Sequence, residues 1–214
     1  MAVVNLPAAK RARANARRRT PEMIEAAARV FAERGFHGAT TQDIADVLGM
    51  RQASLYYYFE SKDAALEAVC ADGVADYARR AQAILHGAGS ASDKVAKLVV
   101  QHLAPMAERL DFTLVFHGER RFLPVPARKR IRAFERRYER LIERVIEQGV
   151  VSGEFRADLD PRIATLALLG LGNSAAAWYG REPGATLERI TSDYVHLLVR
   201  AFRRGSAPKL RVTH

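Results

Sequence analysis

The stretch TTQDIADVLGMRQASLYYYFESKDAAL, Thr40–Leu66, contains two short helical runs separated by Gly49 and followed by three consecutive tyrosines. Helices this short are marginal in isolation, so apolar residues such as Ile44 and Leu55 must hold them on a preceding helix. A glycine can adopt a left-handed turn at no steric cost. The stretch therefore predicts two short helices joined by a tight turn, which is a helix-turn-helix.

The second helix of such a pair lies in the DNA major groove and presents its outward side chains to base edges and phosphates. Glutamine can pair with adenine and arginine with guanine, while hydroxyl and ammonium groups can hold phosphates. A second interpretation is that the turn is only a tight corner and the tyrosines are core. On the DNA-binding interpretation, the outward residues are Arg51, Gln52, Ala53, Ser54, Tyr56 and Tyr57, with Lys62 beside them.

The remaining sequence shows helical periodicity without strand-like alternation or an internal repeat. Thr20 is a plausible helix N-cap, Gly35 ends the first helix, and Pro105 is expected to kink or split a later helix. Thr40 and Asp43 have the spacing of a capping box. We expect an all-α fold of about nine helices, with a three-helix helix-turn-helix DNA-binding domain at the N-terminus and a C-terminal helical bundle for ligand binding and dimerisation.

The domain boundaries follow from charge and loop signals. Residues 1–19 carry many cations and no acid, and we interpret them as a basic flexible arm. The helix-turn-helix domain is placed at 20–66, the ligand-binding and dimerisation domain at 67–205, and a tail at 206–214.

The composition of the 214 residues limits the function classes. The net charge of +10 favours a polyanionic partner such as nucleic acid. One cysteine, Cys70, permits no intramolecular disulfide, so we expect a reducing, cytoplasmic location. No apolar run is long enough to span a membrane. The histidines are scattered and the common catalytic motifs are missing, so we expect no enzyme activity, no cofactor and no metal.

The opening stretch resembles the helix-turn-helix of the tetracycline-repressor (TetR) family. That family's pattern is T-x-x-D-I-A, then G-V-S-x-x-[ST]-L-Y-x-[HY]-F, then x-[ST]-K-[ED]-x-L. The matching residues are Thr40, Asp43, Ile44, Ala45, Gly49, Ser54, Leu55, Tyr56, Tyr58, Phe59, Ser61, Lys62, Asp63 and Leu66. Arg51 stands where the family has a capping serine. Either the helix begins differently here or Arg51 adds a contact.

The resemblance implies a homodimeric repressor that inserts one recognition helix per subunit into a palindromic operator and binds an inducer in its C-terminal domain. An activator is the alternative, because whether the protein represses or activates transcription depends on where the operator lies. The resemblance assigns base contacts to Gln52, Ala53 and Ser54. It assigns phosphate contacts to Thr40, Tyr56, Tyr57, Tyr58 and Lys62.

The later run GEFRADLDPRIATLALLGLGNSAAAWYGREPGATLERI is similar to a subgroup of the family that senses acyl-CoA thioesters or related lipid metabolites. Its matching residues are Gly153, Phe155, Asp160, Leu169, Gly170, Asn173, Trp178, Tyr179 and Gly184. An acyl-CoA needs an apolar tunnel for its chain and cations for its phosphates. The expected pocket residues are Leu103, Met106, Phe112, Phe116, Phe122, Asn173 and Trp178. The expected phosphate ligands are Arg120, Arg121, Arg128, Lys129 and Arg130.

Other interpretations stay open for this half. The aromatic residues can be ordinary core and the cations a solvated helix face, the effector can be a different lipophilic molecule (a drug, steroid or fatty acid), and the chain can be an architectural DNA binder without a ligand. The last two helices hold more apolar residues than one partner helix could cover, so we expect them to form a four-helix dimer interface. Its residues are Leu166, Leu169, Tyr194, Leu197, Leu198, Ala201 and Phe202.

Overall fold

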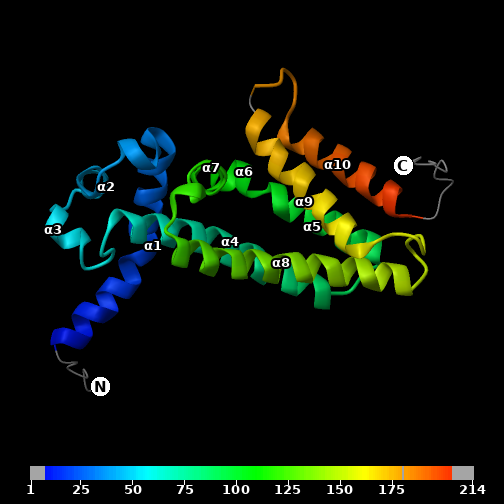
Figure 1. Ribbon diagram of the computed structural model, residues 1–214, viewed down its shortest axis with the longest axis horizontal. Helices are drawn as coiled ribbons and strands as arrows, with labels where there is room; N and C mark the ends of the chain where they lie inside the picture. The colour runs from blue at the N-terminus through cyan, green and yellow to red at the C-terminus, as the bar shows by residue number, and fades with distance from the viewer. Residues whose placement is uncertain (1–7, 180, 204–214) are drawn as a thin grey trace, which may run out of the picture. The chain divides into compact units, whose positions relative to one another are not determined.

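The structure is a computed structural model that describes residues 8–179 and 181–203, with side chains from Arg19 onward. Among these residues it consists of α-helices, one 3₁₀ turn and an isolated β-bridge between Phe155 and Arg203, so the all-α prediction is confirmed (Figure 1). The elements are α1 (Ala8–Gly38), α2 (Thr41–Val47), α3 (Gln52–Leu55), α4 (Lys62–His86), α5 (Ala91–Leu103), α6 (Pro105–Glu108), α7 (Leu110–Gly118), η1 (Arg120–Phe122), α8 (Val125–Val151), α9 (Pro161–Trp178) and α10 (Leu187–Phe202). Pro105 divides the predicted fifth helix into α5 and α6, because a proline removes a backbone donor and its ring clashes with the preceding turn.

The first helix begins earlier than the sequence predicted. α1 starts at Ala8, so residues 8–19, which we expected to belong to a flexible arm, are helical. Alanine and arginine are among the strongest helix formers, and this segment is rich in both. Thr20 therefore lies inside α1 and is no N-cap, while Gly35 (φ 67°) breaks the helix as predicted. Residues 1–7 and the predicted tail at 206–214 lie outside the described residues.

The chain divides into two compact units. The first contains the described residues up to Gly73 together with Arg109–Arg132, and the second contains Val74–Glu108 together with the described residues from Ala133 onward. This division differs from the predicted boundary at residue 66. Segment Arg109–Arg132, which we assigned to the ligand-binding domain, packs instead in the same unit as the helix-turn-helix.

The first unit has a core that joins distant parts of the sequence. Met23, Phe31 and Leu55 are buried in one hydrophobic cluster with Val115 of α7 and Ile131 of α8. The apolar residues of the short helices thus pack on α1 as the sequence required, and α7 covers another part of the same core.

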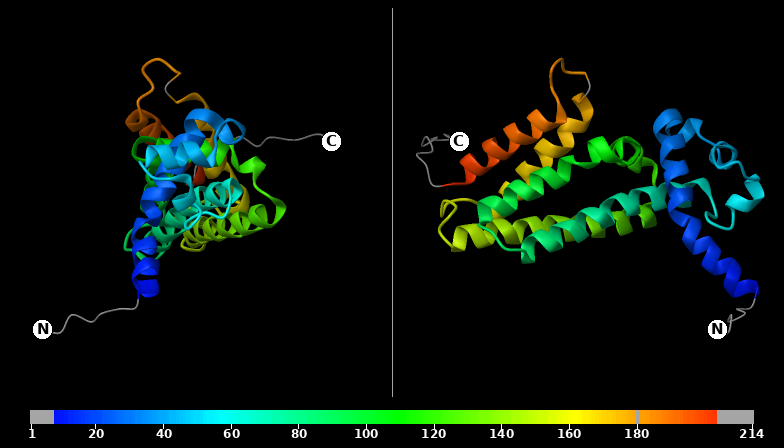
Figure 2. Two further views of the ribbon diagram at one scale, coloured as in Figure 1. Left: turned by 90° about the vertical axis from the view of Figure 1, so that its left-hand side faces the viewer. Right: turned by 180° about the vertical axis from the view of Figure 1, so that it is seen from behind.

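The second unit is a helical bundle with its own core. The chain reverses direction between α9 and α10, so these helices lie side by side and antiparallel, and both pack on α5 (Figures 1 and 2). Phe155 packs edge-on against Phe202 at 5.7 Å between ring centroids, in a cluster that also includes Leu98, Ile142 and Leu168.

Candidate DNA interface and the polar cluster of the second unit

The start of α2 is fixed by a capping box, as predicted. Thr40 Oγ1 accepts a hydrogen bond from Asp43 N and donates one to Asp43 Oδ2 at 2.6 Å, while Asp43 Oδ2 also accepts from Thr40 N. The Thr40 hydroxyl, then its backbone N–H and the Arg34 guanidinium, hold the pKa of the Asp43 carboxyl below its usual value. The Thr40 side chain, which we had assigned to a phosphate, is therefore occupied in capping the helix.

The turn between α2 and α3 has the geometry that the sequence predicted. Gly49 has φ 61°, in the left-handed region. Arg51 is the N-cap of α3, is exposed, and makes no side-chain capping bond. α3 thus begins at the expected place although Arg51 stands where the family has serine, and the Arg51 side chain lies at the surface.

α3 presents a compact exposed surface. Leu55 is buried and anchors the helix on the core. Gln52 Nε2 donates to Thr41 Oγ1 at 2.7 Å, so its amide is held against α2. Tyr56 and Tyr57 are 50% and 86% exposed. Large aromatic side chains exposed to this degree are characteristic of interaction sites.

The other predicted contacts on and after α3 differ among themselves. Ala53 is exposed and Ser54 half-buried, whereas the Tyr58 ring packs against the hydrophobic cluster. We name the exposed residues Arg51, Ala53, Tyr56 and Tyr57 the reading surface.

Lys62 has a structural contact that sequence reasoning missed. Its ammonium donates to the carbonyl oxygens of Phe36 and Ala39, each at 2.8 Å, and lies 4.6 Å from the centroid of the Phe36 ring. The ammonium therefore ties the start of α4 to the end of α1. These carbonyl groups take two of the three ammonium donors, so the phosphate contact of Lys62 stays a prediction.

The segment from the second half of the sequence contacts the same region. Glu119 Oε2 accepts a hydrogen bond from Phe36 N at 2.7 Å. The Phe122 ring stacks on Phe36 at 5.9 Å and meets His37 edge-on at 4.3 Å. The end of α7 and η1 thus fix the backbone just after Gly35, where α1 breaks.

The predicted phosphate ligands are mostly engaged inside the first unit. Arg130 makes a bidentate ion pair with Glu67, at 2.5 and 2.7 Å. The guanidinium groups of Arg120 and Arg121 lie over the Phe116 and Phe122 rings, each at 4.7 Å. Two members of the set, Arg128 and Lys129, are exposed and make no side-chain hydrogen bond or ion pair with any residue the structure describes.

The predicted pocket residues fall into two groups. Leu103, Met106 and Trp178 pack in the hydrophobic cluster of the second unit, and Asn173 lies on α9 of that unit. The aromatic residues Phe112, Phe116 and Phe122 belong to the cluster of the first unit, where Phe122 is held by Phe36. The seven residues therefore do not line one pocket within a single unit.

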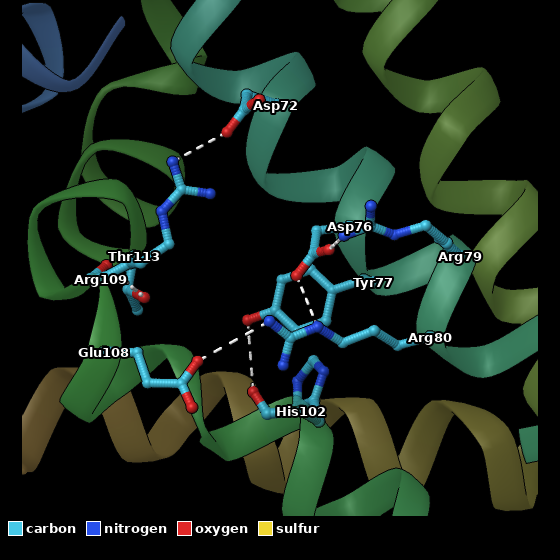
Figure 3. Close-up of polar contacts among 9 residues, drawn as sticks. All are labelled: Asp72, Asp76, Tyr77, Arg79, Arg80, His102, Glu108, Arg109 and Thr113. Carbon is cyan, nitrogen blue, oxygen red and sulfur yellow. Dashed lines mark hydrogen bonds and ion pairs between the residues drawn. The ribbon is translucent and has the colours of Figure 1, made fainter. Parts of the chain in front are cut away.

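A polar cluster that the sequence analysis did not predict lies in the second unit. His102 Nδ1 lies 3.2 Å from Tyr138 Oη, and His102 Nε2 lies 3.2 Å from Asn173 Oδ1. Tyr77 Oη donates to the backbone oxygen of His102 at 3.2 Å (Figure 3). These side chains come from α4, α5, α8 and α9. We name Tyr77, His102, Tyr138 and Asn173 the polar cluster; helical periodicity cannot reveal it, because its members meet only across helices.

The predicted dimer residues divide by exposure. Leu166 on α9 and Leu197 on α10 are 44% and 55% exposed, and Ile163, which was not predicted, is 61% exposed. Leu198 and Phe202 are buried in the core of the second unit, so their assignment to the interface is corrected. Of the remaining predicted residues, Leu169 and Tyr194 are half-buried and Ala201 is exposed.

Two kinds of feature are absent from the described residues. Across residues 8–179 and 181–203, no three His, Cys, Asp or Glu side chains are grouped as metal ligands would be. In the same part of the chain, no helix has the length and apolar content needed to cross a membrane.

The sequence matches two family descriptions. Residues 23–69 match "Bacterial regulatory proteins, tetR family", and residues 88–202 match "Tetracyclin repressor-like, C-terminal domain". Among curated proteins, the chain is similar to the HTH-type transcriptional repressor KstR2 of Mycolicibacterium smegmatis, with 26% identity over 194 residues, covering 89% of this chain and 94% of that protein.

Solved structures show the same fold. A transcriptional regulator of the TetR/AcrR family from Thermobifida fusca is 31% identical, with a TM-score of 0.70 over 87% of this chain and 99% of that one. FadR from Bacillus subtilis, crystallised with stearoyl-CoA, is 23% identical with a TM-score of 0.74, over 85% and 98% of the two chains. AibR, crystallised with isovaleryl coenzyme A and operator DNA, is 21% identical with a TM-score of 0.75, over 85% and 98%.

Proposed function

The chain belongs to the tetR family of bacterial regulatory proteins, and from that premise we propose that it is a transcriptional repressor that binds operator DNA as a homodimer and is released by an acyl-CoA thioester. The observation that carries the DNA-binding part is the reading surface on and beside α3. Tyr57 and Tyr56 are exposed there while Leu55 of the same turn is buried. Apolar anchoring on one side and exposed aromatic and cationic groups on the other are what a recognition helix requires.

The contacts to DNA follow from the observed geometry. Arg51 and Ala53 are the exposed residues at the start of α3, where base edges are reached in this motif. The hydroxyl groups of Tyr56 and Tyr57 are placed to hold phosphates. Gln52 is proposed to contact a base once its amide leaves Thr41, and the half-buried Ser54 is proposed to contact a base directly. Thr40, Tyr58 and Lys62 support the surface from within the unit.

The dimer is proposed to form through α9 and α10. Ile163, Leu166 and Leu197 form exposed apolar positions on helices whose opposite faces are buried. A self-complementary apolar face of this kind suits a twofold interface. Sedimentation of the wild type as a dimer, and of Leu166→Lys as a monomer that keeps its helical content, would support this interface; a dimeric Leu166→Lys would refute it.

The effector class is supported by two relatives of the same fold, one crystallised with stearoyl-CoA and one with isovaleryl coenzyme A. We place its acyl chain in the second unit, beside Leu103, Met106 and Trp178. The effector must bind the DNA-released form more tightly than the DNA-bound form, since equal affinity for both would change nothing. With this role we propose a cytoplasmic location.

A gel-shift titration on DNA upstream of the chain's own gene tests the proposal. Unlabelled upstream DNA should displace the complex at much lower concentration than unrelated DNA, and palmitoyl-CoA should release it while palmitate and CoA do not. Equal competition by unrelated DNA would make the chain an architectural binder. Sequence-specific binding that no thioester releases would leave the repressor and reject the effector.

A further inference from the structure

The polar cluster extends from the buried core of the second unit, where Tyr138 lies, to the surface, where Asn173 is exposed. His102 is half-buried and Tyr138 buried, and the latter belongs to the same hydrophobic cluster as Leu103 and Met106. Burial of polar groups costs stability unless they are hydrogen-bonded, and apolar residues of similar volume would fill the same space at no such cost. The hydrogen bonds of Tyr138 and His102 meet this requirement within the cluster.

One tautomer of His102 satisfies both of its side-chain contacts. When the Asn173 carboxamide oxygen faces the imidazole, His102 Nε2 donates to it. In the neutral imidazole, Nδ1 is then an acceptor, and the Tyr138 hydroxyl donates to it. Burial, with a smaller contribution from Tyr77, raises the pKa of the Tyr138 hydroxyl, so this group stays a neutral donor.

Three hydrogen bonds of the cluster are long. All three distances are 3.2 Å, whereas O–H···O bonds between protein groups are usually about 2.7–2.8 Å and N–H···O bonds about 2.9–3.0 Å. Long bonds gain less energy, so the Tyr138 hydroxyl can exchange its bond to His102 for a bond to a better-placed acceptor at little cost.

Arg80, a cation on α4, is already paired with acidic residues. Arg80 follows Tyr77 by three residues and so lies on the same side of the helix. Its Nε pairs with Asp76 Oδ2 at 2.6 Å and its Nη2 lies 3.7 Å from Glu108 Oε2 (Figure 3). Arg80 is therefore not available as a counter-ion for a carboxylate placed in the cluster, and burying such a carboxylate would be costly. A neutral acceptor would not carry that penalty.

The cluster is attached directly to α9. A Cβ atom built on Gly172 would lie 2.1 Å from His102 Cδ2, so the imidazole ring packs on the bare backbone of α9. Asn173 is the next residue, and Leu166 on the same helix is exposed. If the His102 ring moved, it would therefore press on α9, the helix that carries part of the proposed dimer face.

We propose that the polar cluster is the contact site for the polar group of the effector, and that it selects a neutral acceptor such as the carbonyl oxygen of a thioester over a carboxylate. The ligand carbonyl accepts the hydrogen bond that Tyr138 otherwise donates to His102, and the released imidazole shifts against Gly172. This inference rests on the proposed function, since it identifies which part of an acyl-CoA is recognised and by which residues.

The test compares palmitoyl-CoA with its thioether analogue, S-hexadecyl-CoA, which keeps the chain and the CoA but lacks the carbonyl. Trp178, the single tryptophan of the chain, packs against the same core and reports binding by its fluorescence. The wild type should bind the thioester about tenfold more tightly than the thioether, the value expected for one hydrogen bond. In Tyr138→Phe this preference should fall to about twofold or less. Far-UV circular dichroism shows whether Tyr138→Phe is folded.

A second pair of variants tests the contact with α9 without removing a hydrogen-bonding group. Gly172→Ala forces the His102 ring to move and should also abolish the preference for the thioester. Gly73→Ala is the matched control, because a Cβ atom there would meet nothing within 4 Å, and it should keep the preference.

The outcomes separate this inference from the proposed function. Equal binding of thioester and thioether by the wild type, or an unchanged preference in both Tyr138→Phe and Gly172→Ala, would overturn the inference and leave an acyl-CoA effector in place. Failure of the wild type to bind either compound would overturn the proposed effector, and the inference with it.

Discussion

Polar side chains at the junctions of the first unit hold backbone groups and helix ends at short distances, whereas the polar cluster of the second unit joins side chains from four helices at longer ones. Lys62 and Glu119 form hydrogen bonds with main-chain groups at 2.7–2.8 Å, and Arg130 forms a bidentate ion pair with Glu67 at 2.5 and 2.7 Å. Three hydrogen bonds of the polar cluster are each 3.2 Å long. The first pattern suits a rigid frame that presents a fixed surface, and the second suits an interior whose partners can be exchanged.

The largest expected effect tests how tightly the second unit is packed away from the polar cluster. A Cβ atom on Gly149 would lie 2.2 Å from the Phe155 ring and 2.8 Å from Ala91 Cβ. Gly149→Ala should therefore lower the free energy of unfolding by about 3 kcal/mol. Gly73→Ala should leave it unchanged or raise it by up to about 1 kcal/mol, since its Cβ would be unobstructed and alanine favours the helix. Urea titrations measure both free energies. If Gly149→Ala left the free energy of unfolding unchanged, the core around Phe155 would be able to rearrange as readily as the polar cluster.

Removal of the Lys62 ammonium should break the frame of the first unit. Lys62→Met leaves the carbonyl groups of Phe36 and Ala39 without their donor and should cost about 2–3 kcal/mol of stability. Operator affinity should fall with it, because the end of α1 is no longer tied to α4. Lys129→Met is the control, an exposed lysine with no partner among the described residues. If Lys62→Met lost affinity at full stability, Lys62 would be a direct phosphate contact after all.

Glu119 should show a smaller and more local effect. Glu119→Ala leaves the Phe36 N–H without its acceptor and should cost about 1–2 kcal/mol. Its most direct signature is faster hydrogen exchange of the Phe36 amide. Glu119→Gln keeps a carbonyl oxygen and should restore most of the protection. Unchanged exchange in Glu119→Ala would show that the stacked Phe36 and Phe122 rings alone hold this junction.

The smallest expected effect is the loss of folding stability at acidic pH that arises from the Glu67 carboxyl. The Arg130 guanidinium holds the pKa of the Glu67 carboxyl below its usual value, against the opposing effect of burial. The folded state then binds fewer protons than the unfolded state, so the stabilisation is complete above the ordinary carboxyl pKa of about 4.3 and is lost as the pH falls through the lowered value. Both side chains are partly exposed, so the contribution should stay below about 1 kcal/mol.

Thermal melting between neutral pH and pH 3 checks this prediction. Glu67→Gln should melt lower than wild type at neutral pH and converge with it in acid. The control is Glu60→Gln, an exposed carboxyl without an ion pair among the described residues, which should follow the wild type throughout. A constant difference between Glu67→Gln and wild type at every pH would exclude the ion pair as the cause.

The sequence predicted features that neighbouring residues determine. The capping box at Thr40, the turn at Gly49 and the break at Pro105 depend on local backbone chemistry, and all three are observed. The exposure of Tyr56 and Tyr57 also followed from helical spacing.

Features that depend on packing between distant segments were missed. Lys62 reaches Phe36 across 26 residues, and His102 meets Asn173 across 71, so no periodic pattern contains either contact. Leu198 and Phe202 were assigned to the dimer because they are apolar on an amphipathic helix, but such a helix also has to cover its own core.

The separation of functions between the two units is tested most directly by one paired titration, in which Tyr57→Ala and Tyr138→Phe are each measured for operator affinity by gel shift and for palmitoyl-CoA affinity by Trp178 fluorescence. Tyr57→Ala should bind the operator at least about tenfold more weakly and palmitoyl-CoA as the wild type does. Tyr138→Phe should bind the operator normally and palmitoyl-CoA about tenfold more weakly. If either substitution impaired both affinities in a folded protein, reading and sensing would not be divided between the two units.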